Sequence, residues 1–270
     1  DLGKIKWNSL INSSKGIECK VFFSALNFKD VMLAGGKIHK DSSNLGYSMG
    51  CIGFEFSGVS NNKKIMGFAK NTFSSHVYVK KDMIWEIPEH LTLEQAASIP
   101  TVYATSYYSL IERARIEKGD SILIHAGTGG VGLSAIQIAL NRGLEVFTTC
   151  STSEKKQFLL NRYPLLKEKN IGQSRDTTFE EMIMKETKGQ GVDVVLNSLA
   201  DDKLLASIRC VKQHGHFLEI GKYDLMKNTK IGTKFLLKNI SFHGIDVDQV
   251  FTHPKKWKKV WNLIHTGLQS

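Results

Sequence analysis

The sequence predicts an α/β protein in which a doubly wound parallel sheet follows a smaller, β-rich region. From residue 121 to about residue 244, strand-like and helix-like segments alternate and supply six strands with crossover helices between them. Residues 1–91 instead alternate short strand-like runs with turns and contain one short helical stretch, Phe28–Ala34. The chain therefore divides into two regions of different architecture.

The β-rich region is predicted from five short runs that turn residues separate. These runs are Glu18–Ser24, Gly53–Gly58, Ile65–Phe68, Ser75–Val79 and Ile84–Ile87. The string Thr92-Leu93-Glu94-Gln95 is a capping box, in which the Thr and Gln side chains each accept a backbone N–H that the helix leaves unpaired. A helix therefore starts here, and the apolar segment Thr101–Ala114 predicts a second, buried one.

Residues 121–155 form the βαβ unit around which the chain is organised. Ile122–Ala126 is an apolar run of strand length, Leu133–Arg142 carries apolar residues at helical spacing, and Glu145–Cys150 is a second strand. Between the first strand and the helix stands a G-x-G-x-x-G turn, residues 127–132. In this context the turn predicts a dinucleotide site, and a merely glycine-rich turn is the alternative.

Each glycine of the turn has its own role. Gly127 permits the tight turn, Gly129 lets the backbone approach the pyrophosphate, and Gly132 lets the helix pack on the strand. The helix N-terminus offers unpaired N–H groups and its positive dipole end to phosphate. The predicted cofactor-binding residues of the turn are Gly127, Thr128, Gly129, Gly130, Val131 and Gly132.

The end of the second strand predicts NADPH rather than NADH. An NAD site places an acid there to bind the ribose hydroxyls, whereas this chain has Ser151 and, four residues on, Lys155. Hydroxyl and ammonium donors bind a 2′-phosphate, which a carboxylate would repel. We expect Glu154, next to Lys155, to point elsewhere on its helix. The alternative is an N-cap Ser followed by a solvated Lys pair.

The remaining elements continue the alternation. They are a helix at Ser153–Arg162, a strand at Asn170–Ser174, a helix that Thr177 and Glu180 cap and that ends near Gly189, a strand at Val192–Asn197, a helix at Asp201–Val211, a strand at Gly215–Gly221, a short helix at Thr233–Leu237 and a strand at Ile240–Gly244. Ligands of such sheets bind outside the carboxyl ends of the strands. The candidate site residues there are Gly127–Gly132, Ser151–Lys155, Asn197-Ser198, Gly221-Lys222 and Asp246–Asp248.

Composition predicts a soluble, cytoplasmic protein. No apolar run approaches the roughly 18 residues of a membrane span, and residues 1–20 lack the layout of a signal peptide. The four cysteines are widely spaced, which predicts reduced thiols. The net charge of +10 suits an anionic partner. Its densest cluster, residues 255–259, is better explained as the solvated face of an amphipathic helix than as a nucleic-acid contact.

Several longer strings resemble the enoyl reductase domain of animal type I fatty acid synthase, in the medium-chain dehydrogenase/reductase superfamily. The strings are SALNFKDVMLAGG (24–36), GFEFSGV (53–59), IPTVYATSYYSL (99–110), LIHAGTGGVG (123–132), VLNSLADDKLLASIRC (195–210), FLEIGKYDL (217–225) and FLLKNISFHGIDVD (235–248). The related reducing polyketide synthases share this architecture and remain a near alternative.

The resemblance implies a Rossmann domain at 92–245 and a GroES-like, substrate-side domain at 1–91 with 246–270 that looks incomplete. It implies NADPH-dependent reduction of trans-2-enoyl thioesters on acyl carrier protein, beside other domains of the same synthase and in a homodimer. Lys222 and Asp248 match the family's proposed proton donors, and Asn27 belongs to its nicotinamide-facing string. A Lys–Asp pair of purely structural role and proton delivery by water are the alternatives.

The predicted cofactor-binding residues outside the glycine turn are Asn27, Ser151, Lys155, Asn197, Ser198 and Gly221. No metal site is predicted, because the string Gly53-Phe54-Glu55 has Phe where zinc-dependent relatives have a ligand His. His125 is expected to be a packed core histidine. A stand-alone NADPH quinone or enone reductase and a non-catalytic NADPH-binding protein remain alternative functions.

Overall fold

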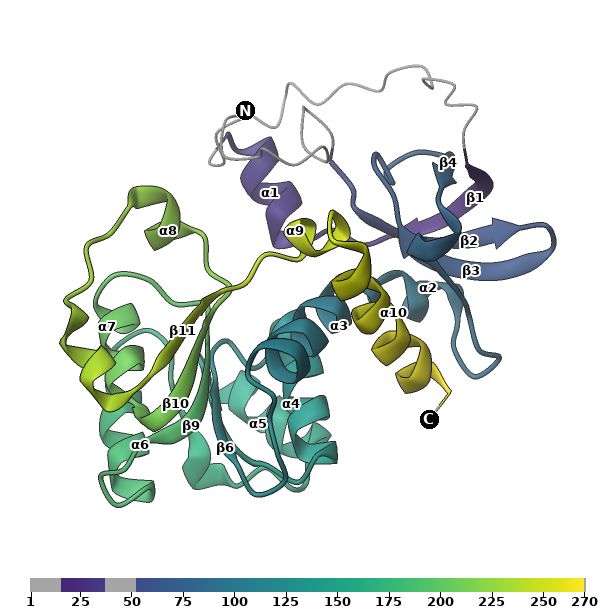
Figure 1. Ribbon diagram of the computed structural model, residues 1–270. Helices are drawn as coiled ribbons and strands as arrows, with labels where there is room; N and C mark the ends of the chain where they lie inside the picture. Colours follow the sequence, from purple (N-terminus) through teal and green to yellow (C-terminus); the bar gives the residue numbers. More distant parts are fainter. Residues whose placement is uncertain (1–15, 37–51, 270) are drawn as a thin grey trace. The chain divides into compact units, whose positions relative to one another are not determined.

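The computed structural model describes residues 16–36 and 52–269. It divides into two compact units, Asp1–Ala104 with Val247–Ser270, and Thr105–Asp246 (Figure 1). The division falls inside helix α3 (Pro100–Tyr107). Helix α2 (Leu93–Ala97) contacts strands of the first unit, so by packing it lies with the β-rich region. The boundary at residue 92 between the substrate-side domain and the cofactor-binding domain stays a prediction.

The first unit is built on an antiparallel sheet of five strands in the order β4-β1-β2-β3-β5. The strands are β1 (Ile17–Ser24), β2 (Glu55–Ser60), β3 (Lys63–Phe68), β4 (His76–Val79) and β5 (Ile84–Glu86). Alternate side chains point to opposite faces of a strand, and one face buries the cluster Cys19, Phe56, Ile65, Ala69, Val77 and Val79. The predicted strands of this region are confirmed, with ends that differ by one or two residues.

Short helices complete the first unit. They are α1 (Phe28–Ala34), a 3-10 turn at Lys81–Met83, α2, the start of α3, α9 (Val247–Phe251) and α10 (Pro254–Leu268). Thr92 and Gln95 form the predicted capping box at the start of α2, because Gln95 N–H donates to Thr92 Oγ1 and Thr92 N–H to Gln95 Oε1. The capping box is therefore confirmed.

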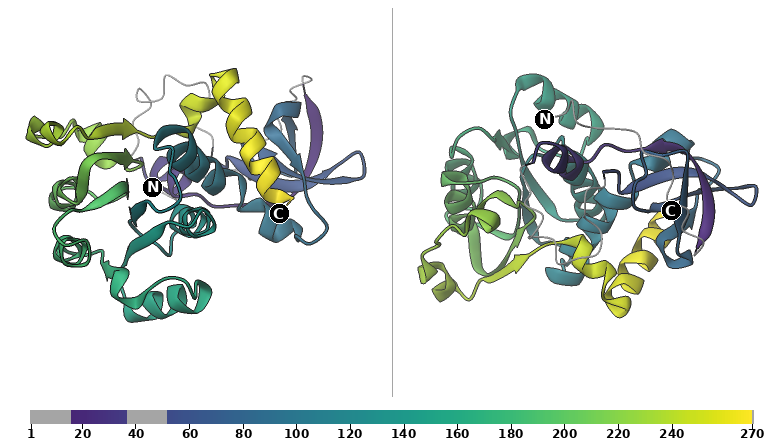
Figure 2. Two further views of the ribbon diagram at one scale, coloured as in Figure 1. Left: turned by 60° about the horizontal axis from the view of Figure 1, so that its bottom comes forward. Right: turned by 90° about the horizontal axis from the view of Figure 1, so that it is seen from above.

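Helix α10 lies along the strands of the first unit, at Ile84 and Trp85 (Figure 2). Its periodicity predicts an apolar face of Trp257, Val260, Trp261 and Ile264. Trp257, Val260 and Ile264 are buried, Trp261 is partly buried, and Leu268 is buried as well. The indole of Trp257 donates to the Asp82 carbonyl (2.8 Å) and packs edge to face on Trp85. The lysines of this helix are exposed, so their interpretation as a solvated face holds.

The second unit contains a parallel sheet in the order β11-β10-β9-β6-β7-β8, and every neighbouring pair is parallel. Its strands are β6 (Ser121–Ile124), β7 (Glu145–Cys150), β8 (Ile171–Gln173), β9 (Val192–Asn197), β10 (Val211–Glu219) and β11 (Ser241–Gly244). Strand order reverses between β6 and β9, which makes this a doubly wound sheet with its switch point there. The predicted six-stranded Rossmann fold is confirmed.

Helices cover both faces of this sheet. Helices α4 (Gly130–Asn141) and α5 (Ser153–Arg162) lie on one face, and α6 (Phe179–Glu186) and α7 (Asp202–Arg209) on the other (Figure 1). Phe147, Phe179, Ile208 and Phe217 are members of the buried cluster between the sheet and α6 and α7. A short α8 (Tyr223–Lys227) and a 3-10 helix (Thr233–Lys238) precede β11.

Three local predictions need correction. Strand β10 begins at Val211, four residues before the predicted Gly215, so Val211 belongs to a strand and not to the preceding helix, which ends at Arg209. The buried helix predicted to Ala114 is α-helical only to Tyr107 and continues as a π-helix at Tyr108–Arg113, where Ala114 N–H donates to Ser109 O. The N-cap position of α6 is Thr178 and not the predicted Thr177, and the Thr178 side chain makes no capping bond. Asp176 Oδ1 accepts the Thr178 N–H (3.0 Å) just before the helix. Over the described part of the chain, no helix combines the length and apolarity that a membrane crossing requires.

Candidate active site

The glycine turn joins β6 to α4 in the second unit. Gly127 N–H donates to Thr149 O (2.9 Å), which fixes the turn to β7. A Cβ at Gly132 would lie 2.4 Å from the Ala126 carbonyl oxygen, so the close approach of helix and turn requires glycine. The N-cap of α4 is Gly129, which has no side chain that could accept from the helix. The first N–H groups of a helix have no intrahelical partner. The turn therefore presents free donors, as a phosphate site requires.

An open hollow of about 500 Å³ lies beside the turn. It is lined by Ala126, Thr128, Gly129, Glu154, Lys155 and Phe158. Lys155 Nζ donates to Ser151 Oγ (3.3 Å), so these two predicted 2′-phosphate ligands are neighbours. The expectation that Glu154 points elsewhere is wrong, because Glu154 lines the same hollow from the first turn of α5. The helix cap is Thr152 and not a serine.

The carboxyl end of β9 carries Asn197 and Ser198. Asn197 is fully buried, and its Nδ2 donates to Glu219 Oε2 (2.6 Å) and to Leu199 O (2.8 Å). Both amide hydrogens are thus used within the protein. Ser198 Oγ is buried and has no hydrogen-bond partner among the described residues. Ser198 therefore has a polar atom that a ligand can satisfy.

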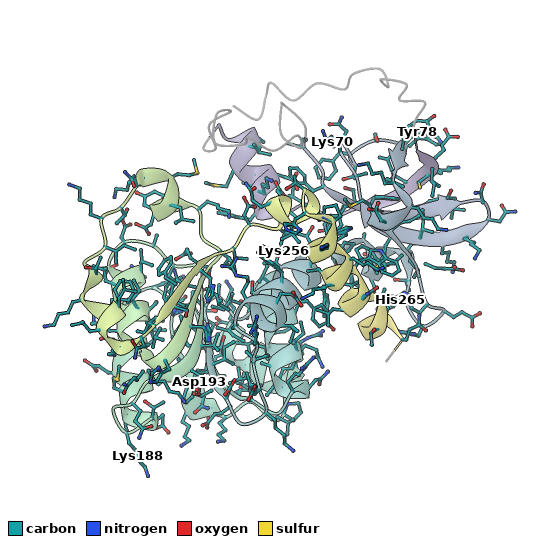
Figure 3. All side chains as sticks on the ribbon, in the orientation of Figure 1. Lys70, Tyr78, Lys188, Asp193, Lys256 and His265 are labelled. Atoms are coloured by element: carbon teal, nitrogen blue, oxygen red, sulfur yellow. The ribbon has the colours of Figure 1, made fainter. Side chains whose placement is uncertain are left out.

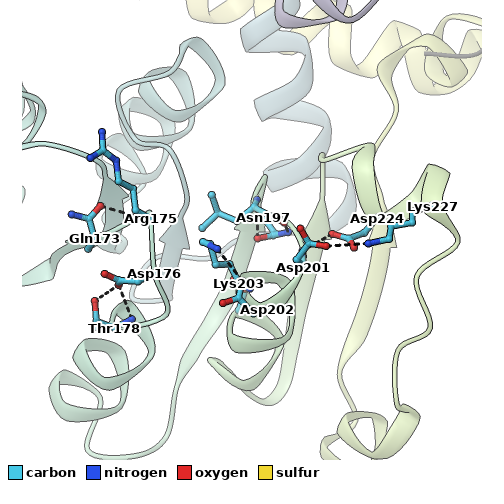
Figure 4. Close-up of polar contacts among 12 residues, drawn as sticks. Gln173, Arg175, Asp176, Thr178, Asn197, Asp201, Asp202, Lys203, Asp224 and Lys227 are labelled. Carbon is cyan, nitrogen blue, oxygen red and sulfur yellow. Dashed lines mark hydrogen bonds and ion pairs between the residues drawn. The ribbon is translucent and has the colours of Figure 1, made fainter. Parts of the chain in front are cut away.

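The next loops along this sheet edge are tied by further polar contacts (Figure 4). Asp224 Oδ2 accepts the Asp201 N–H (3.0 Å), and Lys227 Nζ lies 3.3 Å from Asp201 Oδ1. These bonds join the loop after β9 to helix α8, which follows β10. The strand ends that carry the predicted ligands are therefore held together by side chains.

Lys222 follows β10 and is half-exposed. Its Nζ donates to the Ile245 carbonyl oxygen (2.8 Å) and lies 3.8 Å from Asp246 Oδ1. Gly221, the residue before it, donates its N–H to Glu219 Oε1 (2.6 Å). The ammonium group of Lys222 is thus fixed at the carboxyl edge of the sheet that carries the glycine turn.

Asp248 belongs to the first unit and pairs with Lys29 on α1. The Lys29 ammonium also lies 4.7 Å from the centre of the Phe54 ring, a cation–π contact. Within the second unit Lys222 pairs with Asp246, so the two predicted catalytic residues have different ion-pair partners. The side chain of Asp248 is one-fifth exposed.

Two buried glutamates adjoin the predicted asparagines, and neither was predicted. Glu55 Oε1 accepts from Asn27 Nδ2 (2.7 Å), and its Oε2 accepts from Thr101 N–H (2.8 Å). Glu219 accepts from Asn197 and Gly221. Burial raises the pKa of Glu55 and of Glu219 to about 7, against the hydrogen bonds that lower each. An acid inside an apolar strand run, GFEF or FLEIG, is the sequence signal that identifies such groups.

His125 is a core residue, as predicted. Its ring nitrogens lie 3.0 Å from Thr149 Oγ1 and 2.8 Å from Ser207 Oγ, and burial lowers its pKa to about 3. It is 3% exposed. A neutral imidazole that is bonded on both sides stabilises the core and has no free position for catalysis.

The residues present do not suit a catalytic zinc. In residues 16–36 and 52–269, no three His, Cys, Asp or Glu side chains are grouped as a metal ion needs. Glu55, in the string where zinc-dependent relatives have ligands, uses both oxygens for Asn27 and Thr101. The described cysteines, Cys19, Cys150 and Cys210, are separate, buried and free.

Comparison with known proteins identifies the class. The family model described as zinc-binding dehydrogenase matches residues 130–266, about half of the chain, and the chain therefore belongs to this family. Reducing polyketide synthase FUB1 of Gibberella moniliformis is 37% identical over 252 residues, which are 92% of this chain and 10% of that protein. The chain thus spans about a tenth of the length of its curated relatives.

Solved structures point to one kind of member. The CurK enoyl reductase is 28% identical with a TM-score of 0.86, over 98% of this chain and 84% of that chain. The nucleotide-binding subdomain of the enoylreductase domain of PpsC from Mycobacterium tuberculosis is 32% identical with a TM-score of 0.58, over 63% of this chain and 93% of that chain. A quinone oxidoreductase of Thermus thermophilus, solved also with NADPH, shares the fold at 20% identity and a TM-score of 0.77, over 96% of this chain and 80% of that chain.

The comparisons refine the resemblance seen in the sequence. An enoyl reductase domain of the medium-chain dehydrogenase/reductase superfamily is confirmed. The reducing polyketide synthase alternative is supported better than animal fatty acid synthase. The strings quoted from the sequence do not distinguish a polyketide synthase from a fatty acid synthase, because enoyl reduction in either one needs the same cofactor loop and strand ends.

Proposed function

We propose that this domain uses NADPH to reduce the double bond of 2-enoyl thioesters, on carrier-bound chains of a reducing polyketide synthase. The observation that carries the proposal is the fixed ammonium of Lys222 at the carboxyl edge of the sheet that holds the glycine turn. Ligands of doubly wound sheets bind at this edge. A cation there suits a reaction in which negative charge develops.

The cofactor part of the proposal rests on the turn and the adjoining hollow. The N-terminus of α4 would hold the pyrophosphate, Ser198 Oγ would satisfy one further polar group, and Ser151 with Lys155 would hold the 2′-phosphate. Asn27, Asn197 and Gly221 complete the proposed cofactor-binding set, with Asn197 acting through its buried bonds. NADPH, when bound, supplies the hydride that adds to the β-carbon of the enoyl thioester.

The protein must then stabilise negative charge on the thioester oxygen and deliver a proton to the α-carbon. Lys222 can do both, since its ammonium group carries three donor hydrogens and the Ile245 carbonyl uses one. Asp248 is the second candidate acid, and its side chain is already engaged in an ion pair with Lys29.

The synthase context follows from the curated relatives, in which the matching segment is about a tenth of the protein. We propose that the other domains of such a synthase deliver the substrate on a carrier protein. The net charge of +10 would favour an acidic carrier.

The test is NADPH oxidation by the domain with crotonyl thioester, with a quinone and with neither substrate. Turnover with the thioester and little with the quinone supports the proposal. Preference for the quinone would identify a stand-alone type of reductase, and NADPH binding without turnover on either substrate would identify a non-catalytic binder. A comparison of straight and α-methyl-branched enoyl thioesters would then separate polyketide from fatty acid chains.

A further inference from the structure

The carboxylate of Glu219 joins two strand ends of the second unit. Glu219 is the last residue of β10 and is 3% exposed. Its Oε2 accepts from the Asn197 amide at the end of β9 (2.6 Å), and its Oε1 accepts from the backbone N–H of Gly221 (2.6 Å). The side chain is therefore almost wholly shielded from solvent, and both of its oxygens have partners inside the protein.

The direction of these bonds is fixed by the neighbouring backbone. Asn197 Nδ2 also donates to Leu199 O (2.8 Å), and Asn197 Oδ1 accepts the Leu199 N–H (3.3 Å). A flipped amide would place oxygen against oxygen at Leu199. The amide nitrogen must therefore face Glu219, and Glu219 must accept from both of its partners.

Glu219 also fixes, through its backbone, the turn that carries Lys222. The backbone carbonyl of Glu219 accepts the Ile245 N–H (2.8 Å), and the Ile245 carbonyl accepts from Lys222 Nζ (2.8 Å). A closed ring of bonds thus runs from Glu219 through Ile245 to Lys222. A Cβ at Gly221 would lie 2.7 Å from Glu219 Oε1, so glycine at this position lets the carboxylate reach the backbone.

We propose that Glu219 is a positioning residue, whose ionised carboxylate sets the Gly221–Lys222 turn and couples it to Asn197. This inference rests on the proposed function, in which Lys222 serves the enoyl thioester. Glu219 touches neither substrate nor cofactor in this role. A neutral amide of the same shape would place an NH₂ group against one of two fixed donors, which removes the bond and adds a repulsive contact.

The decisive experiment compares Glu219→Gln with the unchanged protein and with Glu181→Gln, a matched change at an exposed glutamate of α6. We expect Glu219→Gln to lower kcat with crotonyl thioester about 10- to 100-fold, the size of effect that a misplaced catalytic group produces, with KM for the thioester little changed. Glu181→Gln should leave kcat unchanged.

A pH profile provides a readout that a purely structural role would not move. Burial raises the pKa of Glu219 to about 7; the bonds from Asn197 and Gly221 lower it, the nearby carboxylate of Asp224 raises it and the ammonium of Lys222 lowers it. Since the bonds require the ionised form, kcat of the unchanged protein should rise with pH through about 7. That limb should be absent in Glu219→Gln. Normal kcat in Glu219→Gln, or weaker NADPH binding with normal kcat, would overturn the inference.

A second variant decides the matter if Glu219→Gln does not fold. Gly221→Ala places a methyl group against the carboxylate and should lower kcat in the same way. Where Glu219→Gln does fold, the double variant should lose less than the sum of the two single effects, because both changes break one contact. Full activity of a folded Gly221→Ala protein would overturn the inference. If the unchanged protein does not reduce enoyl thioesters at all, the proposed function has failed instead.

Discussion

The two units share one local arrangement, a buried glutamate that accepts from an asparagine amide and from a backbone N–H. In the first unit Glu55 binds Asn27 and Thr101, and in the second Glu219 binds Asn197 and Gly221. Burial raises the pKa of each to about 7. In both units the cost of burying a carboxylate is therefore offset by the same two kinds of donor, an asparagine amide and a backbone N–H.

What differs is the element that each glutamate fixes. Glu55 binds Asn27, the N-cap of α1, two residues before Lys29, and its other partner is an N–H in the first turn of α3. Glu219 binds the backbone beside Lys222. The first arrangement thus acts on a lysine through a helix start, and the second through one peptide bond. Similar buried glutamates therefore fix the backbone near a lysine at different distances along the chain.

The largest contrast is expected between the two lysines. Lys222→Ala should lower kcat about 10²–10⁴-fold with little change in NADPH affinity, because it removes the proposed donor and charge stabiliser. Lys29→Ala and Asp248→Asn should be milder, since that pair already neutralises its own charge. Steady-state turnover with crotonyl thioester beside an NADPH titration measures both effects.

Two outcomes would change this assignment. Normal turnover in Lys222→Ala would show that water or Asp248 donates the proton. Loss of NADPH binding would make Lys222 a cofactor ligand. If Lys222→Ala and Asp248→Asn serve one step, their double variant should be less than additive. Asp246→Asn is the matched control, because it removes the ion-pair partner of Lys222 and leaves the lysine in place.

The buried glutamates should give matching pH dependences of stability. A carboxyl whose folded pKa is raised binds its proton more tightly in the folded state, so its contribution to the free energy of unfolding is full below the unfolded pKa of 4.5 and is lost as pH rises to about 7. The free energy of unfolding of the unchanged protein should fall over this window by on the order of 3 kcal/mol relative to that of Glu55→Gln, and likewise relative to that of Glu219→Gln.

Denaturant unfolding between pH 4.5 and 8 checks this expectation. An exposed control, Glu181→Gln, should show no such slope. A slope in only one of the two variants would show that the units differ in how they solvate the buried acid, and that the shared arrangement is superficial.

The two charges in the hollow beside the glycine turn should have opposite effects on cofactor choice. Lys155→Ala should weaken NADPH binding by about 1.5–3 kcal/mol, the size of a charge-assisted hydrogen bond, and leave NADH binding unchanged. Glu154→Gln should instead strengthen NADPH binding, because it removes a carboxylate that lines the same space. Titrations of the two cofactors measure this directly, and equal affinity of the unchanged protein for both would contradict the NADPH assignment.

The smallest effect is expected on the exposed lysines of α10. Activity on carrier-bound substrate should fall with salt more steeply than activity on a small thioester, and Lys255→Ala with Lys256→Ala should flatten that difference several-fold at most. The pair Lys185→Ala and Lys188→Ala removes the same charge from the second unit. Figure 3 shows Lys256 and Lys188, one from each set. Identical salt profiles for the two substrates would remove this explanation of the net charge.

The sequence by itself determined the fold of the second unit and the place of its ligand edge. Apolar runs of strand length, helical spacing and the glycine turn are local signals, and they placed all six parallel strands and the residues that follow them. The face of α10 that is buried was predicted for the same reason. The sequence did not determine whether the chain serves polyketide or fatty acid synthesis, because the strings that carry the resemblance belong to parts that related synthases share.

Only the tertiary structure decided how the charged groups are paired. Asp246 and Asp248 are two residues apart in the segment after β11, yet Asp246 pairs with Lys222 and Asp248 with Lys29, a partner 219 residues away. Glu154 proved to line the hollow, and Glu55 and Glu219 proved to be buried. Periodicity describes neighbours along one element, whereas these contacts depend on side-chain direction and on which elements the folded chain brings together.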